Sequence, residues 1–116
     1  MKLRIGIDLV QVSRIAESMA QFGERFLARV FTDGERAYAT AGAGDRVAER
    51  LAARFAAKEA VKKALNLDGV GWRAIEVVRG PDGAPAIALH GVACEGELAV
   101  SFSHEGDYAT AVVIAA

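Results

Sequence analysis

Glu59 stands among closely spaced cations in a stretch with the pattern of a helix, where apolar residues would otherwise be expected. The run from Arg54 to Lys63 reads RFAAKEAVKK. At about 100° per residue, Glu59 and Lys63 share a strip with small and aromatic side chains. The remaining cations, Arg54, Lys58 and Lys62, form a second, basic strip. Carboxylate oxygens suit a divalent cation and basic side chains suit a polyphosphate, so the pattern is typical of a phosphoryl-transfer site.

Asp8 is a second carboxylate of the kind that this chemistry uses. Residues 3–8 alternate apolar and polar side chains, which predicts a strand with Asp8 at its end, opposite the apolar face. Magnesium keeps several waters and needs few protein ligands when phosphate supplies the rest. Each acid also has a plainer interpretation. Glu59 could form an ion pair with Lys63, worth about a few tenths of a kcal/mol if exposed, and Asp8 could be an ordinary turn residue.

The segment Ser101-Phe102-Ser103-His104 is a third candidate. A nucleophilic dyad of Ser103 and His104 is not expected, because adjacent residues of a strand face opposite sides. A histidine at the end of a strand could instead bind a phosphate or nucleotide, or be a hydrophilic turn residue. We interpret His90, which ends an earlier strand, as structural.

The first helical region combines arginines with apolar side chains on neighbouring stripes. The arginines are Arg14, Arg25 and Arg29, and the apolar residues are Met19, Phe22 and Phe26. Charges of this kind usually form a solvated face. The alternative is a docking surface for an acidic helix, in which apolar anchors fix position and arginines steer the partner.

Periodicity and turn residues predict the elements that would position these side chains. They are a strand at 3–8, a helical region capped by Ser13 with a break at Gly23, a short helix at 33–40 begun by a Thr32–Glu35 capping box, a connection at 41–45, a long helix at 46–65 ended by Asn66, and two hairpins made of strands 75–79, 86–89, 98–104 and 109–115. We therefore predict a single α+β domain over residues 1–116, with a largely antiparallel sheet packed on the long central helix. The strand order does not follow from the sequence.

Composition excludes several classes of protein. The net charge of −1 lacks the electrostatic footprint of a general nucleic-acid binder. The single cysteine, Cys94, excludes an intrachain disulfide and a multi-cysteine metal site, and we interpret it as a small buried apolar residue. No segment approaches a membrane span and the N-terminal alternation is unlike a signal peptide, so we expect no membrane association and a cytoplasmic location.

Three motifs in order along nearly the whole chain closely resemble holo-acyl-carrier-protein synthases, the small 4′-phosphopantetheinyl transferases. They are Gly6-Ile7-Asp8 followed by Arg14-Ile15, Arg54 to Ala60 followed by Lys63-Ala64-Leu65, and Ser101 to His104. The resemblance implies the phosphopantetheinyl transferase fold. It also implies transfer of the 4′-phosphopantetheine arm of coenzyme A to a serine of an apo acyl carrier protein of the fatty-acid or polyketide type, releasing adenosine 3′,5′-bisphosphate. The implied enzyme is a magnesium-dependent homotrimer with active sites between subunits.

The resemblance also assigns roles to residues. Asp8 and Glu59 correspond to the magnesium ligands, Lys63 to a contact to the coenzyme A pyrophosphate, and Arg54 and His104 to contacts to its adenosine end. Asp8, Glu59 and Lys63 thus form the implied catalytic set. The carrier-docking residues would be Arg14, Met19, Phe22, Arg25, Phe26 and Arg29. Glu59 through a metal-bound water, or Glu35 through a water, could accept the serine proton, and the general base stays open.

One departure from the family pattern concerns the segment before the final Ser-x-Ser-His motif. Family members commonly carry a longer helix there, whereas only Gly91 to Glu97 intervenes in this chain. We expect the shortening to affect the edge of the coenzyme A binding site, the packing of the trimer and the choice of carrier more than the metal site. Two alternatives remain open: a coenzyme A or carrier-binding module with lost or weak catalysis, and a purely structural oligomerisation domain that binds neither magnesium nor coenzyme A.

Overall fold

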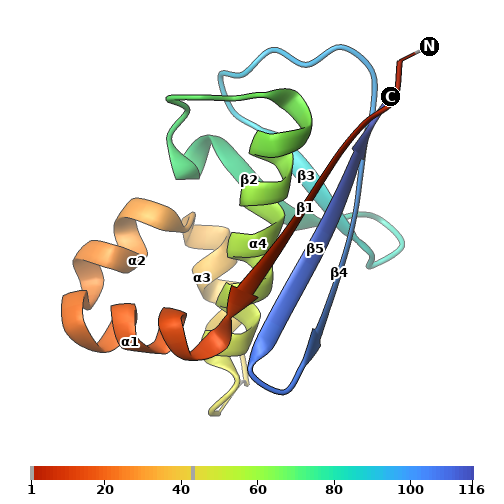
Figure 1. The fold of residues 1–116 in the computed structure, drawn as a ribbon. Helices are drawn as coiled ribbons and strands as arrows, with labels where there is room; N and C mark the ends of the chain where they lie inside the picture. Colours follow the sequence, from red (N-terminus) through yellow and green to blue (C-terminus); the bar gives the residue numbers. More distant parts are fainter. Residues whose placement is uncertain (1, 43) are drawn as a thin grey trace.

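One long helix, α4 (Val47–Leu65), runs through the middle of the molecule, and the other elements pack around it (Figure 1). The computed structural model describes residues 2–42 and 44–116. The remaining elements are β1 (Arg4–Gln11), α1 (Val12–Phe22), α2 (Glu24–Val30), α3 (Asp33–Thr40), the 3-10 helix η1 (Trp72–Ala74), β2 (Ile75–Arg79), β3 (Pro85–Leu89), β4 (Leu98–Glu105) and β5 (Tyr108–Ala115).

The described strands form two antiparallel sheets, one with the order β1-β5-β4 and one with β2 and β3. Helix α4 lies between the three-stranded sheet and the helices α1 to α3 (Figure 1). The predicted α+β class and both hairpins are confirmed. The last strand, β5, lies between β1 and β4 and is antiparallel to both. The first and last strands of the chain are therefore neighbours in the sheet.

The alanines of α4 allow the sheet to approach the helix closely. Ala56, Ala60 and Ala64 are buried in the core, together with Ala111 of β5. Gly6 of β1 lies directly against the helix, and a Cβ atom at this position would collide with the backbone carbonyl of Ala60. Small side chains at this contact therefore bring β1, and with it Asp8, close to α4.

The start of α1 differs from the prediction. Strand β1 continues to Gln11 and leads directly into the helix, so the expectation that Asp8 ends the strand is wrong. Ser13 does not cap the helix. Instead, Asp107 in the β4–β5 turn accepts hydrogen bonds from the Ser13 amide at 2.9 Å and the Ser13 hydroxyl at 2.6 Å. A carboxylate distant in sequence thus satisfies the first turn of α1, as a cap would.

Other local predictions are confirmed. The Thr32–Glu35 capping box begins α3, Gly23 separates α1 from α2, and Asn66 ends α4 in the left-handed conformation. Residues 90–97 run between β3 and β4 without a helix, and Cys94 in this segment is half-buried rather than in the core. Of the predicted connection at 41–45, Ala43 lies outside the described residues. None of the helices within residues 2–42 and 44–116 combines the length and apolarity needed to cross a membrane.

Candidate functional site

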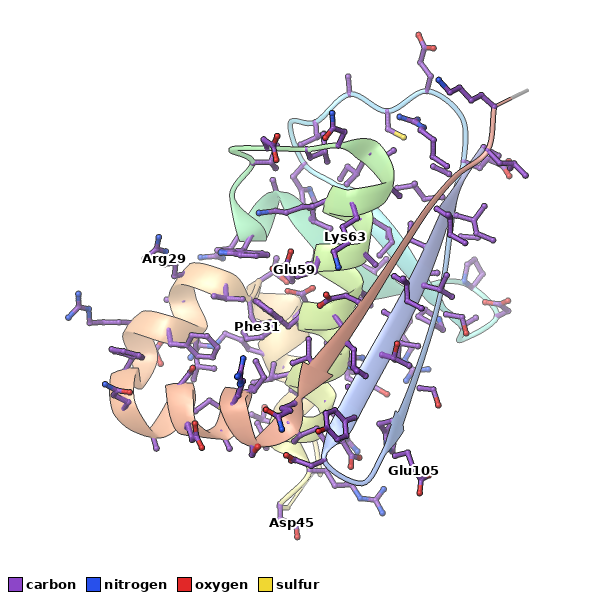
Figure 2. The ribbon with its side chains drawn as sticks, viewed as in Figure 1. Arg29, Phe31, Asp45, Glu59, Lys63 and Glu105 are labelled. Carbon is purple, nitrogen blue, oxygen red and sulfur yellow. The ribbon has the colours of Figure 1, made fainter. Side chains whose placement is uncertain are left out.

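Asp8 and Lys63 meet where β1 crosses α4. The face of β1 that packs on the helix carries Gly6 and Val10, and Asp8 lies between them on the same face. Lys63 Nζ donates to Asp8 Oδ1 at 3.0 Å and to the carbonyl oxygen of Ile7 at 3.0 Å. Figure 2 shows Glu59 and Lys63 close together on α4, next to β1. One helical turn therefore presents a carboxylate and an ammonium to the strand that carries Asp8.

Asp8 and Glu59 line one cavity of about 570 Å³. Its walls also include Arg14 of α1 and the rings of Phe26 and Phe55. Burial is the largest cause that raises the pKa of Glu59, and the charge of Asp8 raises it further, against the opposing effect of Lys62 and Lys63. The two predicted acids therefore face the same partly desolvated space, where their mutual repulsion favours a cation.

The donors at this cavity fit magnesium. Within the described part of the chain, no three His, Cys, Asp or Glu side chains gather into a metal site. Asp8 and Glu59 therefore offer a pair of oxygen donors without soft nitrogen or sulfur ligands. This set is too small to enclose calcium or zinc but suits an ion that keeps waters and takes phosphate oxygens. Asp8 already pairs with one cationic group, the ammonium of Lys63, at 3.0 Å.

Arg54 and His104 lie together in a different cavity, of about 160 Å³, which Arg50 and Phe102 also line. Arg54 is only 5% exposed, and its guanidinium stacks on the Tyr38 ring with Cζ 4.1 Å from the centroid. No described residue accepts a hydrogen bond from its buried Nε. Arg54 therefore has an unused donor beside a cavity lined by arginines and aromatic rings, and by Glu49, whose Oε2 lies 3.5 Å from His104 Nδ1. The sequence analysis did not identify Arg46, Arg50 and Tyr38 as lining residues. Arg46 and Arg50 could have been found, because they precede Arg54 at intervals of four residues.

The predicted basic strip of α4 does not form an exposed surface, because Arg54 and Lys58 are buried. Lys58 is fully buried, where its ammonium pairs with Glu35 at 2.6 Å and donates to the carbonyl oxygens of Val30, Trp72 and Ile75. Burial lowers the pKa of Lys58, and Glu35 opposes this effect. Three segments of chain are thus tied to α4 through one side chain.

The ion pair between Lys58 and Glu35 excludes Glu35 as a general base. Besides Lys58, Glu35 accepts hydrogen bonds from the backbone amides of Thr32 and Val77, and it is fully buried. A carboxylate that is fully buried and held by three donors is not accessible to a water at the substrate. The alternative that used Glu35 is therefore wrong, and its role is to stabilise the fold. His90 is structural as predicted, since its Nε2 lies 2.9 Å from Glu76 Oε1.

A third, apolar cavity of about 480 Å³ opens over α2. It is lined by Phe22, Arg25, Phe26, Arg29, Val30, Phe55 and Trp72. Most of the predicted docking residues therefore gather at one place, with arginines at an aromatic surface. Met19 is half-buried against the core, and Arg14 lines the neighbouring cavity with Glu59. Lys62, the last member of the supposed basic strip, lies over the Trp72 ring at 3.6 Å.

Comparisons with known proteins agree with this geometry. The family model described as the 4′-phosphopantetheinyl transferase superfamily matches residues 4–113. A holo-[acyl-carrier-protein] synthase of Gloeobacter violaceus is 50% identical, over 95% of this chain and 89% of the relative. One of Koribacter versatilis is 45% identical, over 98% of both chains.

Solved structures show the same fold. An ACPS–CoA complex named for Chronobacterium ammoniagenes has a TM-score of 0.83 and 35% identity, with 98% of this chain and 96% of that chain covered. A holo-(acyl-carrier-protein) synthase of Bacillus anthracis in complex with CoA (3′,5′-ADP) has a TM-score of 0.82 and 33% identity, covering 97% and 94%. With its fold, its paired acids and these relatives, the chain belongs to the 4′-phosphopantetheinyl transferase superfamily.

Proposed function

We propose that this chain catalyses the reaction for which its relatives are named. It transfers the 4′-phosphopantetheine arm of coenzyme A to a serine hydroxyl of an apo acyl carrier protein and releases adenosine 3′,5′-bisphosphate. The observation that carries the proposal is that Asp8 and Glu59 line one cavity, and that Lys63 pairs with Asp8, in a chain of this family. The proposal includes a cytoplasmic location and a carrier of the fatty-acid or polyketide type.

Asp8 and Glu59 would hold Mg²⁺, and Lys63 would donate to the diphosphate of coenzyme A. A bound Mg²⁺ would offset the charge of the diphosphate, the usual role of the metal in phosphoryl transfer. Asp8 is fixed by its place in β1, where its carbonyl oxygen accepts a hydrogen bond from Thr110 at 2.8 Å. The rings of Phe26 and Phe55 line the cavity beside the acids.

The adenosine end would be bound by Arg54 and His104. The unpartnered Nε of Arg54 supports this role, because a buried guanidinium donor without an acceptor favours an anionic or polar ligand. These two residues and the acidic pair line separate cavities of one chain. A site completed by two copies of the chain accounts for this separation.

A homotrimer is the assembly that we propose. The sheet face that points away from α4 exposes Leu3, Ile5, Ile7 and Leu9, each between 63% and 67%. Ile114 of β5, which pairs with Ile5, continues this apolar stripe at 42% exposed. Contiguous apolar strands of this kind are costly in water and are usually covered by another subunit. This observation supports an interface, and the number of three comes from the family resemblance.

The carrier would dock on α1 and α2. Arg14, Arg25 and Arg29 are exposed beside Phe22 and Phe26, and a cavity opens between the latter residues and α4. This arrangement places cationic groups around an apolar anchor site, next to the cavity that holds Glu59. A carrier helix with acidic residues and one apolar side chain fits it, and the carrier serine would then enter beside the acids.

Mass spectrometry of an apo carrier after incubation with coenzyme A and Mg²⁺ tests the proposal. We expect the carrier to gain the mass of the phosphopantetheine arm. Glu59→Gln should slow transfer by about a hundredfold or more, because it removes one charged metal ligand, while circular dichroism shows an unchanged fold. Glu95→Gln, at an exposed loop position, is the matched control. Absence of product with a panel of fatty-acid and polyketide carriers would contradict the function.

A coenzyme A or carrier-binding module with weak catalysis is the second candidate. The loop at residues 90–97, which stands where the family commonly has a helix, favours it, since it leaves a cavity of about 270 Å³ lined by Leu89, Val92 and Cys94 at the surface. Saturable binding of coenzyme A together with no transfer to any carrier would identify this function.

A further inference from the structure

Lys63 holds the position that a cation would take at Asp8. Its Nζ lies 3.0 Å from Asp8 Oδ1 and 3.0 Å from the carbonyl oxygen of Ile7, so it neutralises the acid and uses a second oxygen of the same strand. We infer that Lys63 is an exchangeable counter-ion, which Mg²⁺ displaces from Asp8 and which the coenzyme A diphosphate then accepts. This inference rests on the proposed function and adds a coupling between its two ligands.

The charges around the cavity explain why a counter-ion is needed. Asp8 and Glu59 both line it, and the raised pKa of Glu59 has burial and the charge of Asp8 as its causes. Two carboxylates in a partly desolvated space destabilise each other unless a cation lies between or beside them. Lys63 supplies that cation at Asp8. Lys62, the adjacent ammonium, lies over the Trp72 ring instead, 3.6 Å from its centroid.

The mobile partner in this exchange is the lysine. The side chain of Lys63 is 55% exposed, whereas that of Asp8 is 18% exposed. Asp8 is also held within β1 by the ladder to β5, in which it pairs with Ala111. A long, exposed side chain can change rotamer at low cost, whereas the strand cannot shift without breaking its ladder. Lys63 can therefore leave Asp8 without a change of fold.

Exchange makes the binding of the two ligands interdependent. When Mg²⁺ binds alone, it must break the contacts of Lys63 with Asp8 and Ile7 and leave the ammonium without an anionic partner. When coenzyme A is present, its diphosphate becomes the anionic partner of Lys63. This new contact offsets the free energy of breaking the contacts with Asp8 and Ile7. A ligand shifts such an equilibrium only by its differential affinity, and the coupling is reciprocal. Lys63 therefore weakens binding of the metal alone and strengthens binding of the metal together with coenzyme A.

Calorimetric titration of Mg²⁺ into metal-free protein tests the inference. Wild type, Lys63→Gln and Lys62→Gln are each titrated with and without saturating coenzyme A, and a titration of Mg²⁺ into coenzyme A alone is subtracted. Without coenzyme A, we expect Lys63→Gln to bind Mg²⁺ about fivefold or more tightly than wild type, within the usual range of coupling between sites. The gain in Mg²⁺ affinity caused by coenzyme A should shrink by a similar factor. Lys62→Gln removes the same charge, which also acts on Glu59, but no contact to Asp8, so it should gain less Mg²⁺ affinity than Lys63→Gln.

Two results would overturn the inference. In the first, Lys63→Gln binds Mg²⁺ without coenzyme A no more tightly than wild type does. In the second, Lys62→Gln gains as much Mg²⁺ affinity as Lys63→Gln, which would mean that only the net charge matters. The wild-type protein gives a second measurement that needs no stable variant. The Lys63 side-chain nitrogen resonance should shift when Mg²⁺ and coenzyme A are added together, and an unshifted resonance counts against exchange. If the wild-type protein transfers the arm but the expected Mg²⁺ affinities and resonance shift are not found, only this inference is wrong. If the wild-type protein does not transfer the arm, the proposed function itself is contradicted.

Discussion

Gly6 of β1 lies against the backbone of Ala60 in α4, so close that a methyl group on Gly6 would overlap the Ala60 carbonyl oxygen and crowd the amide nitrogen of Ala64. This contact fixes the distance between strand and helix two residues before Asp8. The cavity lined by Asp8 and Glu59 therefore depends on a glycine that has no side chain of its own.

Gly6→Ala should destabilise the protein by about 3 kcal/mol, because backbone atoms rather than a flexible side chain would have to move. We expect a lower urea midpoint and weaker Mg²⁺ binding in the presence of coenzyme A, since β1 would be displaced from α4. Gly71→Ala is the control, as a Cβ atom there meets no neighbour within 4 Å. Equal urea midpoints for the two variants would show that the close contact does not matter.

Arg14→Glu should impair carrier recognition more than coenzyme A binding, although Arg14 also lines the cavity of Asp8 and Glu59. The arginine is exposed near the start of α1 and would face acidic residues of the carrier, so reversing its charge turns attraction into repulsion. We expect KM for the carrier to rise about tenfold or more. Lys2→Glu, an equal charge change at an exposed residue before β1, is the control. Equal losses in carrier KM and coenzyme A affinity in Arg14→Glu would argue against a docking role.

Ile5→Asp should dissociate the proposed trimer. Ile5 lies in the exposed apolar stripe of the sheet, and burying an unpaired carboxylate in a subunit interface costs several kcal/mol. Light scattering coupled to size-exclusion chromatography should show a trimer for wild type and a monomer for the variant. Coenzyme A affinity should fall with it, because Arg54 and the acidic pair would no longer complete one site. Ala93→Asp, in an exposed loop, should remain trimeric; a monomeric wild type would refute the assembly.

Glu76 should contribute stability that is lost in acid. Its pKa is lowered chiefly by the hydrogen bond from Thr32 at 2.6 Å, against the opposing effect of burial and with a smaller contribution from His90. A depressed carboxyl pKa stabilises the fold above the ordinary value of 4.5, and this contribution disappears as pH falls below 4.5 toward the folded-state pKa. Urea unfolding from pH 7 to about pH 3 should therefore show the gap between wild type and Glu76→Gln narrowing below 4.5. A constant gap over that range would exclude the effect, and Glu95→Gln should show no such narrowing.

Local signals predicted most of the elements because each depends on neighbours in sequence. The Thr32–Glu35 capping box, the break at Gly23 and the left-handed Asn66 need only a few adjacent residues to form. Ser13 failed as a cap for the opposite reason. Its acceptor, Asp107, is 94 residues away and reaches α1 only when the last hairpin has folded. No spacing rule within the first helix could have revealed that partner.

Helical periodicity was informative about which residues share a strip of α4 but not about what covers each strip. The spacing correctly placed Glu59 and Lys63 together, and the same spacing wrongly made Lys58 part of a basic surface. Lys58 is buried because α2, η1 and β2 close over that side of the helix and Glu35 supplies the opposite charge. Burial on a helix depends on the packing of distant elements, which periodicity does not contain.

The sequence by itself determined the residue types of the candidate site: Asp8, Glu59 and Lys63 in motifs of one family, with His104 and the arginines in the same motifs or near them. Only the tertiary structure decided which of these meet. It brings Asp8 into contact with Lys63 across 55 positions of chain, and it separates Arg54 and His104 into another cavity. Local patterns fix secondary structure through short-range hydrogen bonds and side-chain spacing. Contacts between elements depend on the close approach that Gly6 and the alanines of α4 permit, and that approach exists only in the folded chain.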